Sequence, residues 1–206
     1  MRNFQDLIKR DIHDVMGWCL PEKRAFIESL VRERQAKRCV EIGVWKGSSL
    51  LCFANALAET QGTIVGIDPW ALVNLRNEIP DLTLREYVFG TLFTEQETLD
   101  AVYRDLEALV ATNGLADIVS LVRKPSWDAF MDFEVESIDV LCIDGNHDEI
   151  HVSRDILMYL PLVKRNGAIL MDDTNYESVA KAIRRYLDPY AMLGFDGGYF
   201  ACYVKR

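Results

Sequence analysis

Hydrophobic residues recur along this chain in two patterns that alternate. Short apolar runs of strand length occupy residues 38–42, 63–68, 118–122, 138–143 and 168–171. Between them, apolar residues recur at helical spacing, which predicts helices over residues 48–60, 95–112, 149–162 and 177–187. Strands that alternate with helices in this way are typical of a parallel sheet with helices on both faces.

The two ends of the chain depart from this alternation. Residues 192–195 and 199–204 flank a D-G-G turn, which is typical of a β-hairpin. Near the start, the spacing of apolar residues between Phe4 and Val15 predicts an amphipathic helix, and Pro21 predicts the first turn of a second helix that ends near residue 37. We keep two interpretations of these helices, a lid over the substrate and a dimer contact.

Together these elements predict one α/β domain over residues 1–206. Its core, residues 38–206, is expected to be a doubly wound, mostly parallel seven-stranded sheet that ends in an antiparallel hairpin. Residues 1–37 form an N-terminal helical extension, and residues near 70–113 form an insertion. In such sheets ligands bind at the carboxyl ends of the strands, so residues at these positions are the candidates for function.

Overall charge and cysteine usage narrow the environment and the partners. The net charge of −9 disfavours nucleic acid, because phosphate backbones are bound by clustered Lys and Arg. The five cysteines are scattered and form no CxxC pair, which is typical of reduced, buried thiols. The N-terminal residues contain no apolar signal core, and no apolar run reaches transmembrane length. We therefore expect a cytoplasmic protein with no membrane partner.

The turn of residues 41–47, E-I-G-V-W-K-G, joins the first strand to the helix that follows it. Its G-x-x-x-G spacing lacks the second glycine of the dinucleotide fingerprint G-x-G-x-x-G, so a diphosphate would be crowded. Glu41 would repel a diphosphate but can accept a hydrogen bond from an ammonium group. Asp68, at the end of the second strand, is placed to bind ribose hydroxyls; the alternative is that it caps a loop. These features disfavour an NAD-dependent oxidoreductase.

With this turn, this acid and this strand order, residues 38–206 resemble the class I S-adenosylmethionine-dependent methyltransferases. The resemblance implies a Rossmann-like fold with S-adenosylmethionine as the cofactor. It matches cofactor-binding positions of that class to residues of this chain, from the methionine end to the adenine. They are Glu41 and Gly43 at the methionine, Gly47 and Ser49 beside its carboxylate, Asp68 on the ribose, and Ser126 and Trp127 at the adenine.

Carboxylates gather at the ends of two further strands. Asp144 follows the fourth strand, and the pair Asp172-Asp173 follows the fifth. Three carboxylates in one small site would repel each other unless a cation neutralised them, and oxygen ligands favour magnesium, calcium or manganese over zinc. The alternative is that an acid of the pair caps the next helix and that Asp144 only contacts the cofactor.

This carboxylate pattern resembles the metal-dependent O-methyltransferases, and more closely the macrocin and aminocoumarin sugar O-methyltransferases than the catechol-type enzymes. Catechol-type enzymes have Asp-Asn where this chain has Asp172-Asp173. The resemblance implies that Mg²⁺ or another divalent cation binds Asp144, Asp172 and Asp173. His147, three residues after Asp144, is the best candidate for the general base, and His151 is a weaker one.

We therefore expect O-methylation of a small-molecule hydroxyl, on a sugar or a phenol, with Asp144 and His147 as catalytic residues and a homo-oligomer, a dimer, as the assembly. One alternative is a cephalosporin hydroxylase-like protein, a relative that shares the D-G-N-H and acidic-pair pattern but has a different assigned chemistry. Another is a non-catalytic member that binds the cofactor or a partner protein. Residues 70–113 and the N-terminal helices are expected to build the substrate pocket.

Overall fold

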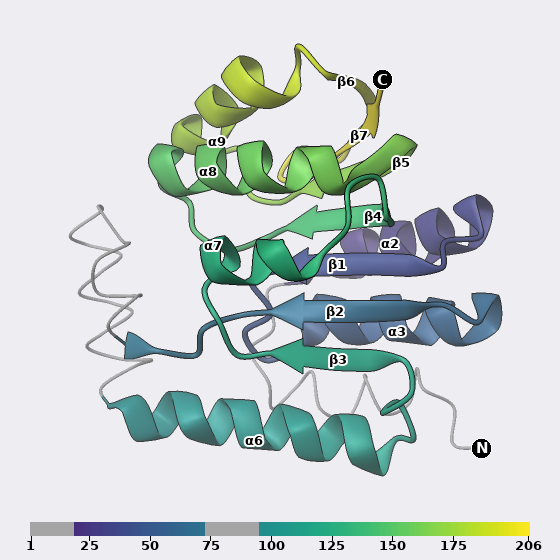
Figure 1. The fold of residues 1–206 in the computed structure, drawn as a ribbon, viewed down its shortest axis with the longest axis vertical. Helices are drawn as coiled ribbons and strands as arrows, with labels where there is room; N and C mark the ends of the chain where they lie inside the picture. Colours follow the sequence, from purple (N-terminus) through teal and green to yellow (C-terminus); the bar gives the residue numbers. More distant parts are fainter. Residues whose placement is uncertain (1–18, 73–94) are drawn as a thin grey trace.

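The computed structural model describes residues 19–72 and 95–206, and its centre is a seven-stranded sheet (Figure 1). The strand order is β3-β2-β1-β4-β5-β7-β6. The strands are β1 (Arg38–Ile42), β2 (Thr63–Ile67), β3 (Val119–Val122), β4 (Ile138–Ile143), β5 (Val163–Met171), β6 (Ala191–Asp196) and β7 (Ala201–Lys205). Strands β1 to β5 are parallel, and β7 is antiparallel to both of its neighbours. The predicted fold class is confirmed.

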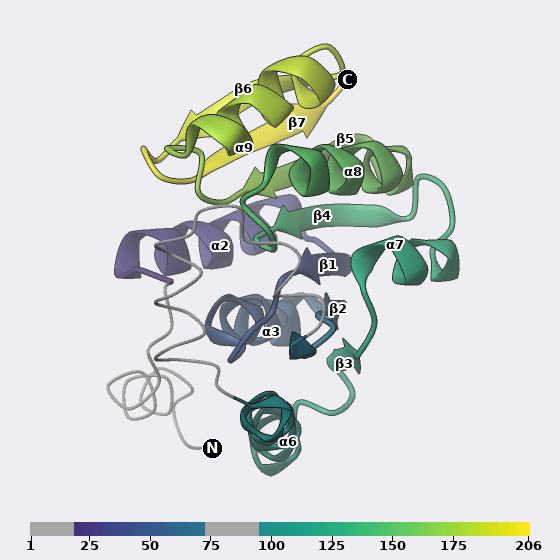
Figure 2. The same ribbon diagram turned by 90° about the vertical axis from the view of Figure 1, so that its left-hand side faces the viewer.

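Helices cover both faces of this sheet. They are α2 (Pro21–Arg34), α3 (Ser48–Thr60), α6 (Gln96–Thr112), α7 (Ser126–Ala129), α8 (Glu149–Tyr159) and α9 (Glu177–Ala182). Helices α2 and α3 lie on one face, and α7 and α8 lie on the other (Figure 2). Helix α6 runs along the β3 end of the sheet (Figure 1). None of the described helices is long and apolar enough to cross a membrane.

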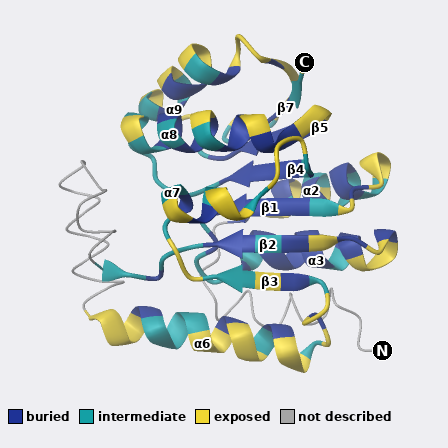
Figure 3. Cartoon of the chain, viewed as in Figure 1, coloured by how far each residue is buried: buried dark blue, intermediate teal, exposed yellow. Residues whose placement is uncertain are grey.

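Buried residues line the strands and the helix faces that pack on them (Figure 3), and they form two hydrophobic clusters, one on each face of the sheet. In the central strands, alternate residues enter different clusters, because successive side chains of a strand point to opposite faces. In β4, Val140 and Cys142 pack towards α2 and α3, whereas Leu141 and Ile143 pack towards α8 and α9. All five cysteines are buried and free of disulfides, as the sequence predicted.

Several boundaries differ from those predicted. Helix α2 ends at Arg34 rather than near residue 37, because Gln35 has a left-handed backbone with a φ of 49°. Strand β5 begins at Val163, five residues before the predicted start. The apolar pattern does not reveal this first part, because Lys164–Asn166 are polar and exposed. The predicted helix over 177–187 widens into a π-helical turn at Ile183–Leu187. The helix predicted near the start of the chain and residues 73–94 of the insertion lie outside the described residues.

Candidate active site

The candidate residues lie at the carboxyl edge of the sheet, where the arrowheads of β1 to β4 end in Figure 1. The backbone ladder continues one residue past the strands. The amides of Gly43, Asp144 and Asp172 each donate to the last carbonyl of a neighbouring strand, at 2.8 to 3.0 Å. The sheet register therefore fixes the relative positions of the glycine turn and the two aspartates.

Strand alternation directs three acids towards the same face of the sheet. Glu41, Asp144 and Asp172 each follow, two residues later in the chain, a residue that packs in the cluster towards α2 and α3. Because side chains two apart in a strand share a face, all three carboxylates lie on the α2 side. The sequence predicts from the strand ends alone that these acids lie close together. The structure shows that they do so because the sheet register aligns the strand ends and because the three side chains share one face of the sheet.

Both glycines of the turn have left-handed backbone conformations and lie close to neighbouring parts of the protein. Gly43 has a φ of +85°, and a Cβ atom there would lie 2.1 Å from the carbonyl oxygen of Asp144. Gly47 has a φ of +84°, and its Cβ would lie 2.5 Å from a methyl carbon of Leu106 on α6. Since only glycine tolerates both the backbone conformation and the contact, the turn can lie against the β4–α8 loop and α6. Contact of either glycine with a cofactor remains a prediction.

Asp68 closes the glycine turn from the end of β2. Its Oδ2 accepts hydrogen bonds from the amides of Val44 (3.1 Å) and Trp45 (3.0 Å), and its Oδ1 accepts one from the amide of Trp70 (2.8 Å). Burial raises the pKa of Asp68, and these hydrogen bonds oppose the rise. This geometry matches the loop-capping interpretation, and the ribose contact remains a prediction.

Glu41 is the most deeply buried acid of the edge, with 0% of the residue exposed. Neither of its carboxylate oxygens has a hydrogen-bond partner within 3.5 Å among the described residues. Burial raises the pKa of Glu41 to about 8; the nearby Ser49 hydroxyl and the charge of Lys23 oppose the rise. A carboxylate in this state favours a cationic ligand, because a positive charge would offset the cost of its burial.

The three predicted metal ligands do come together. One oxygen from each of Asp144, Asp172 and Asp173 lies within 4.8 Å of the others. Asp173 has a φ of 52°, a left-handed conformation that Asp tolerates better than most residues, and this backbone turn lets the adjacent acids share one site. Oδ1 of Asp172 is buried and has no hydrogen-bond partner in the described chain. Hard oxygen donors with an unsatisfied buried oxygen fit a divalent cation such as Mg²⁺.

Lys23, in the first turn of α2, contacts this cluster from the helix that covers this face of the sheet. Its Nζ lies 2.7 Å from Oδ2 of Asp144 and 2.5 Å from Oδ2 of Asp172, and its side chain is 0% exposed. Burial alone would lower the pKa of Lys23, but the charge of Asp144, with that of Asp172, outweighs it and raises the pKa. The ammonium is therefore charged. The Asp144 side chain is 22% exposed, so water reaches the outer side of the cluster.

His147 adjoins the cluster on its exposed side. Its Nε2 lies 2.5 Å from Oδ2 of Asp173, and its ring stacks on Tyr176 with centroids 5.1 Å apart. Ser178 donates a hydrogen bond to the His147 carbonyl, which fixes the backbone. His151, by contrast, lies with Nδ1 3.5 Å from Asp148, outside the three-carboxylate cluster. The geometry favours His147 over His151 as the base.

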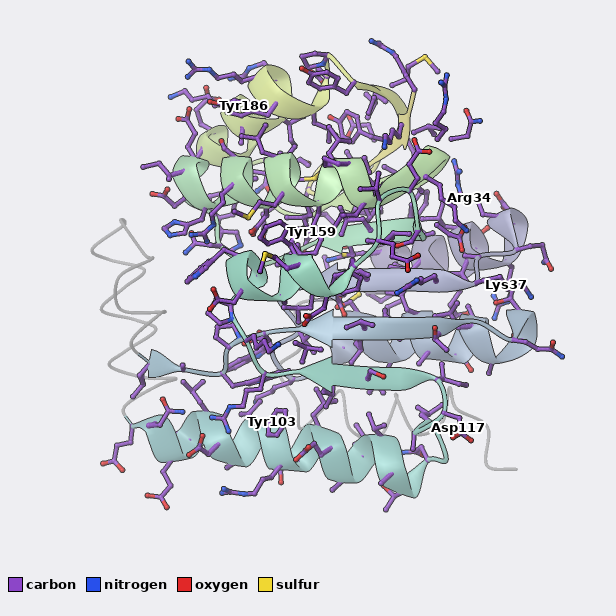
Figure 4. The ribbon with its side chains drawn as sticks, in the orientation of Figure 1. Arg34, Lys37, Tyr103, Asp117, Tyr159 and Tyr186 are labelled. Carbon is purple, nitrogen blue, oxygen red and sulfur yellow. The ribbon has the colours of Figure 1, made fainter. Side chains whose placement is uncertain are left out.

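The two predicted adenine contacts follow β3 and are held by helix α8. Ser126 is buried, and its hydroxyl donates to Oδ1 of Asp155 at 2.5 Å. The Tyr159 hydroxyl, labelled in Figure 4, donates to the Ser126 carbonyl at 2.8 Å. Trp127 lies under the guanidinium of Arg154, 3.8 Å from the ring centroid. Both residues are held by contacts within the protein, and their contact with adenine remains a prediction.

Sequence reasoning missed Lys23 and Asp155, although a signal existed for each. Lys23 precedes the buried Ile27 by four residues, so it lies on the apolar face of α2. Asp155 lies on the buried face of α8, three residues after Val152. A charged residue on the apolar face of a helix is expensive unless it is paired, and this pattern points to a buried partner.

Comparison with known proteins agrees with this geometry. A family model described as a methyltransferase domain matches residues 40–174, and one described as O-methyltransferase matches residues 5–72. None of the curated protein sequences matches the chain.

Similar solved structures include an O-methyltransferase from Bacillus cereus in complex with S-adenosylhomocysteine (16% identity, 98% of this chain and 90% of that one, TM-score 0.63). A second is an S-adenosylhomocysteine-bound methyltransferase from Podospora anserina (16% identity, 98% of this chain and 86% of that one, TM-score 0.66). A third is the O-methyltransferase TomG from Streptomyces achromogenes, involved in tomaymycin synthesis and solved with S-adenosylmethionine (15% identity, 100% of this chain and 90% of that one, TM-score 0.63).

The strand order and the family match together identify a methyltransferase domain with the class I fold. The chain belongs to the methyltransferase domain family whose model spans residues 40–174.

Proposed function

We propose that this protein methylates a hydroxyl group of a small molecule, a sugar or a phenol, with the assistance of a divalent cation. The observation that carries the proposal is the cluster of Asp144, Asp172 and Asp173 with His147 in contact with it. The cluster lies beside Glu41 at one sheet edge, so a cofactor and a metal would be neighbours. The match to an O-methyltransferase family model supports oxygen as the methyl acceptor.

S-adenosylmethionine, when bound, supplies a methyl group on a positively charged sulfur. Glu41 is suited to accept hydrogen bonds from its ammonium group, because the carboxylate is buried without another partner among the described residues. The other residues proposed to hold the cofactor are Gly43, Gly47, Ser49, Asp68, Ser126, Trp127 and Asp144.

A divalent cation on the three aspartates supplies positive charge that favours the ionised form of a nearby hydroxyl. His147 would accept the proton of the substrate hydroxyl as the hydroxyl oxygen takes up the methyl group, with the remaining thioether as the leaving group. Asp173, 2.5 Å from Nε2, stabilises the imidazolium that results. Most of the rate enhancement comes from holding the hydroxyl in line with the methyl group.

Transfer of a tritiated methyl group from S-adenosylmethionine to catechol, caffeate and free hexoses tests the proposal. We expect EDTA to abolish transfer and Mg²⁺ to restore it. His147→Ala is expected to lower kcat by roughly 10²- to 10⁴-fold, the usual contribution of a general base. His151→Ala is the matched control, because His151 lies outside the cluster.

Each part of the proposal has its own contrary result. Full activity in EDTA would refute the metal, and a fully active His147→Ala would refute the base. A protein that binds S-adenosylhomocysteine in calorimetry but methylates none of these acceptors would favour the non-catalytic alternative. Five buried, free cysteines support the proposed cytoplasmic location, and the homodimer is tested by light scattering of the purified chain.

A further inference from the structure

Lys23 divides the oxygens of the carboxylate cluster into two sets. Its ammonium contacts Oδ2 of Asp144 and Oδ2 of Asp172, at 2.7 and 2.5 Å. Oδ1 of Asp172 is left buried with no hydrogen-bond partner among the described residues. The ammonium thus takes one oxygen of the Asp172 carboxylate and leaves the other for a further positive partner.

This contact restricts how both carboxylates can turn. A carboxylate on a short side chain rotates freely about its last bond unless hydrogen bonds hold it. Lys23 is itself held, because its side chain is 0% exposed and the helix that carries it is anchored by the buried Ile27 and Val31. The orientation of Asp144 and Asp172 is therefore restricted by a buried neighbour on helix α2.

Charge balance leads to the same conclusion. With a divalent cation bound, the three acids would be present as carboxylates, and the cation and the Lys23 ammonium together would balance their three negative charges. Without the ammonium, the same cation would leave one buried negative charge uncompensated, which is costly in a partly buried site.

We propose that Lys23 is a positioning residue of the metal site, which orients Asp144 and Asp172 through their Oδ2 atoms so that their remaining oxygens, with Asp173, receive the divalent cation. This inference rests on the proposed function, because it assumes that the three aspartates bind a metal. Outer partners of metal ligands usually contribute a factor of about 10 to 100 to metal affinity. Lys23 is expected to contribute within this range.

Mn²⁺ binding to the purified full chain, followed by electron paramagnetic resonance, tests this without any substrate. Lys23→Met keeps the length of the side chain and removes the ammonium, and we expect it to weaken Mn²⁺ binding by roughly 10- to 100-fold. Arg32→Met is the matched control: it removes one positive charge from the same helix, but Arg32 pairs with Glu28 and Glu59 instead. We expect this variant to bind Mn²⁺ as the wild type does.

The opposite model, in which ammonium and metal compete for the same oxygens, makes the opposite prediction. Tighter or unchanged Mn²⁺ binding by Lys23→Met would overturn the inference. Acylation of the wild-type protein, with the modified lysines identified by mass spectrometry, decides the matter even where Lys23→Met does not fold. If Lys23 positions the two aspartates, it stays protected from acylation both with and without Mn²⁺. Acylation of Lys23 that appears only when Mn²⁺ is added would overturn the inference.

Failure of the inference and failure of the proposed function give different results. A wild type that binds Mn²⁺, loses it in Asp173→Asn and keeps it in Lys23→Met would refute the role of Lys23 alone. A wild type that binds no Mn²⁺ and methylates in EDTA would refute the metal site as well, and with it the inference.

Discussion

The burial of Glu41 predicts a pH dependence of the free energy of unfolding that can be measured without any substrate. The residue is fully buried, and burial raises its pKa from an ordinary 4.5 to about 8. Between these two pH values the carboxyl group binds a proton in the folded protein but not in the unfolded chain. Because the folded state then holds more protons, the free energy of unfolding falls as the pH rises through this window and levels off above about 8.

The size of the effect follows from the two pKa values. The gap between 4.5 and about 8, at ~1.4 kcal/mol per pKa unit, corresponds to roughly 5 kcal/mol of stability lost by pH 8. Glu41→Gln replaces the carboxyl by a neutral group of the same shape, so the variant lacks this loss. We expect wild type and variant to be similar in stability at pH 5, and the variant to be more stable by roughly 3 kcal/mol at pH 7.

Urea unfolding at pH 5, 6, 7 and 8, followed by circular dichroism, measures the difference between the two proteins at each pH. Glu59→Gln is the matched control, because Glu59 is exposed and its hydrogen bond with Arg32 lowers its pKa. The same chemical change there is expected to leave the pH dependence nearly unchanged. Parallel stability curves for wild type and Glu41→Gln would refute the reasoning about burial.

The same ionisation bears on the cofactor. A cationic ligand favours the charged carboxylate, so binding of S-adenosylhomocysteine near pH 7 is expected to release a proton from Glu41. Calorimetry in two buffers with different ionisation enthalpies measures this release. Glu41→Gln is expected to bind more weakly and to release no such proton. Equal proton release by both proteins would place the cofactor's ammonium elsewhere.

Two further predictions concern the framework of the site. Gly43→Ala is expected to destabilise the protein by roughly 3 kcal/mol or more in thermal unfolding, because its Cβ would lie 2.1 Å from the Asp144 carbonyl oxygen. Gly198→Ala is the control: Gly198 has a φ of +86° and no atom within 4 Å of the added Cβ, so this variant should cost only about 1 kcal/mol. Equal losses of stability in the two variants would contradict the packing argument. Ser126→Ala removes the hydroxyl that donates to the buried Asp155 and is expected to cost about 1 to 3 kcal/mol in urea unfolding, while an unchanged midpoint would mean that Asp155 is satisfied without it.

Much of the fold could be predicted because the apolar pattern matches the period of each element. Strands β1 and β4 and helix α3 begin and end where the pattern predicts, since apolar residues dominate each element and a glycine or an acid lies close to its end. The first half of β5 was missed for the converse reason. Its residues Lys164–Asn166 are polar and exposed, so nothing in local hydrophobicity distinguishes them from a loop, and only pairing along the sheet makes them a strand.

For the site, strand ends were enough to predict the meeting of Asp144, Asp172 and Asp173, because parallel neighbours end at one edge. Their countercharge could not be found that way. Lys23 is 121 residues from Asp144 in the sequence, and their contact depends on which face of the sheet α2 covers. That choice is made by tertiary packing and leaves only an indirect trace in the sequence, a lysine on the apolar face of an amphipathic helix.

The alternation of side chains along the strands links these observations. It directs Glu41, Asp144 and Asp172 to the face that α2 covers, so the acid proposed to bind the cofactor and two of the proposed metal ligands lie on the same side of the sheet as Lys23. Helix α2 therefore contributes to this edge of the sheet, because its Lys23 contacts both Asp144 and Asp172. Both interpretations of the N-terminal extension, lid and dimer contact, stay predictions, and the contacts of Lys23 show that α2 also reaches the carboxyl edge within the domain.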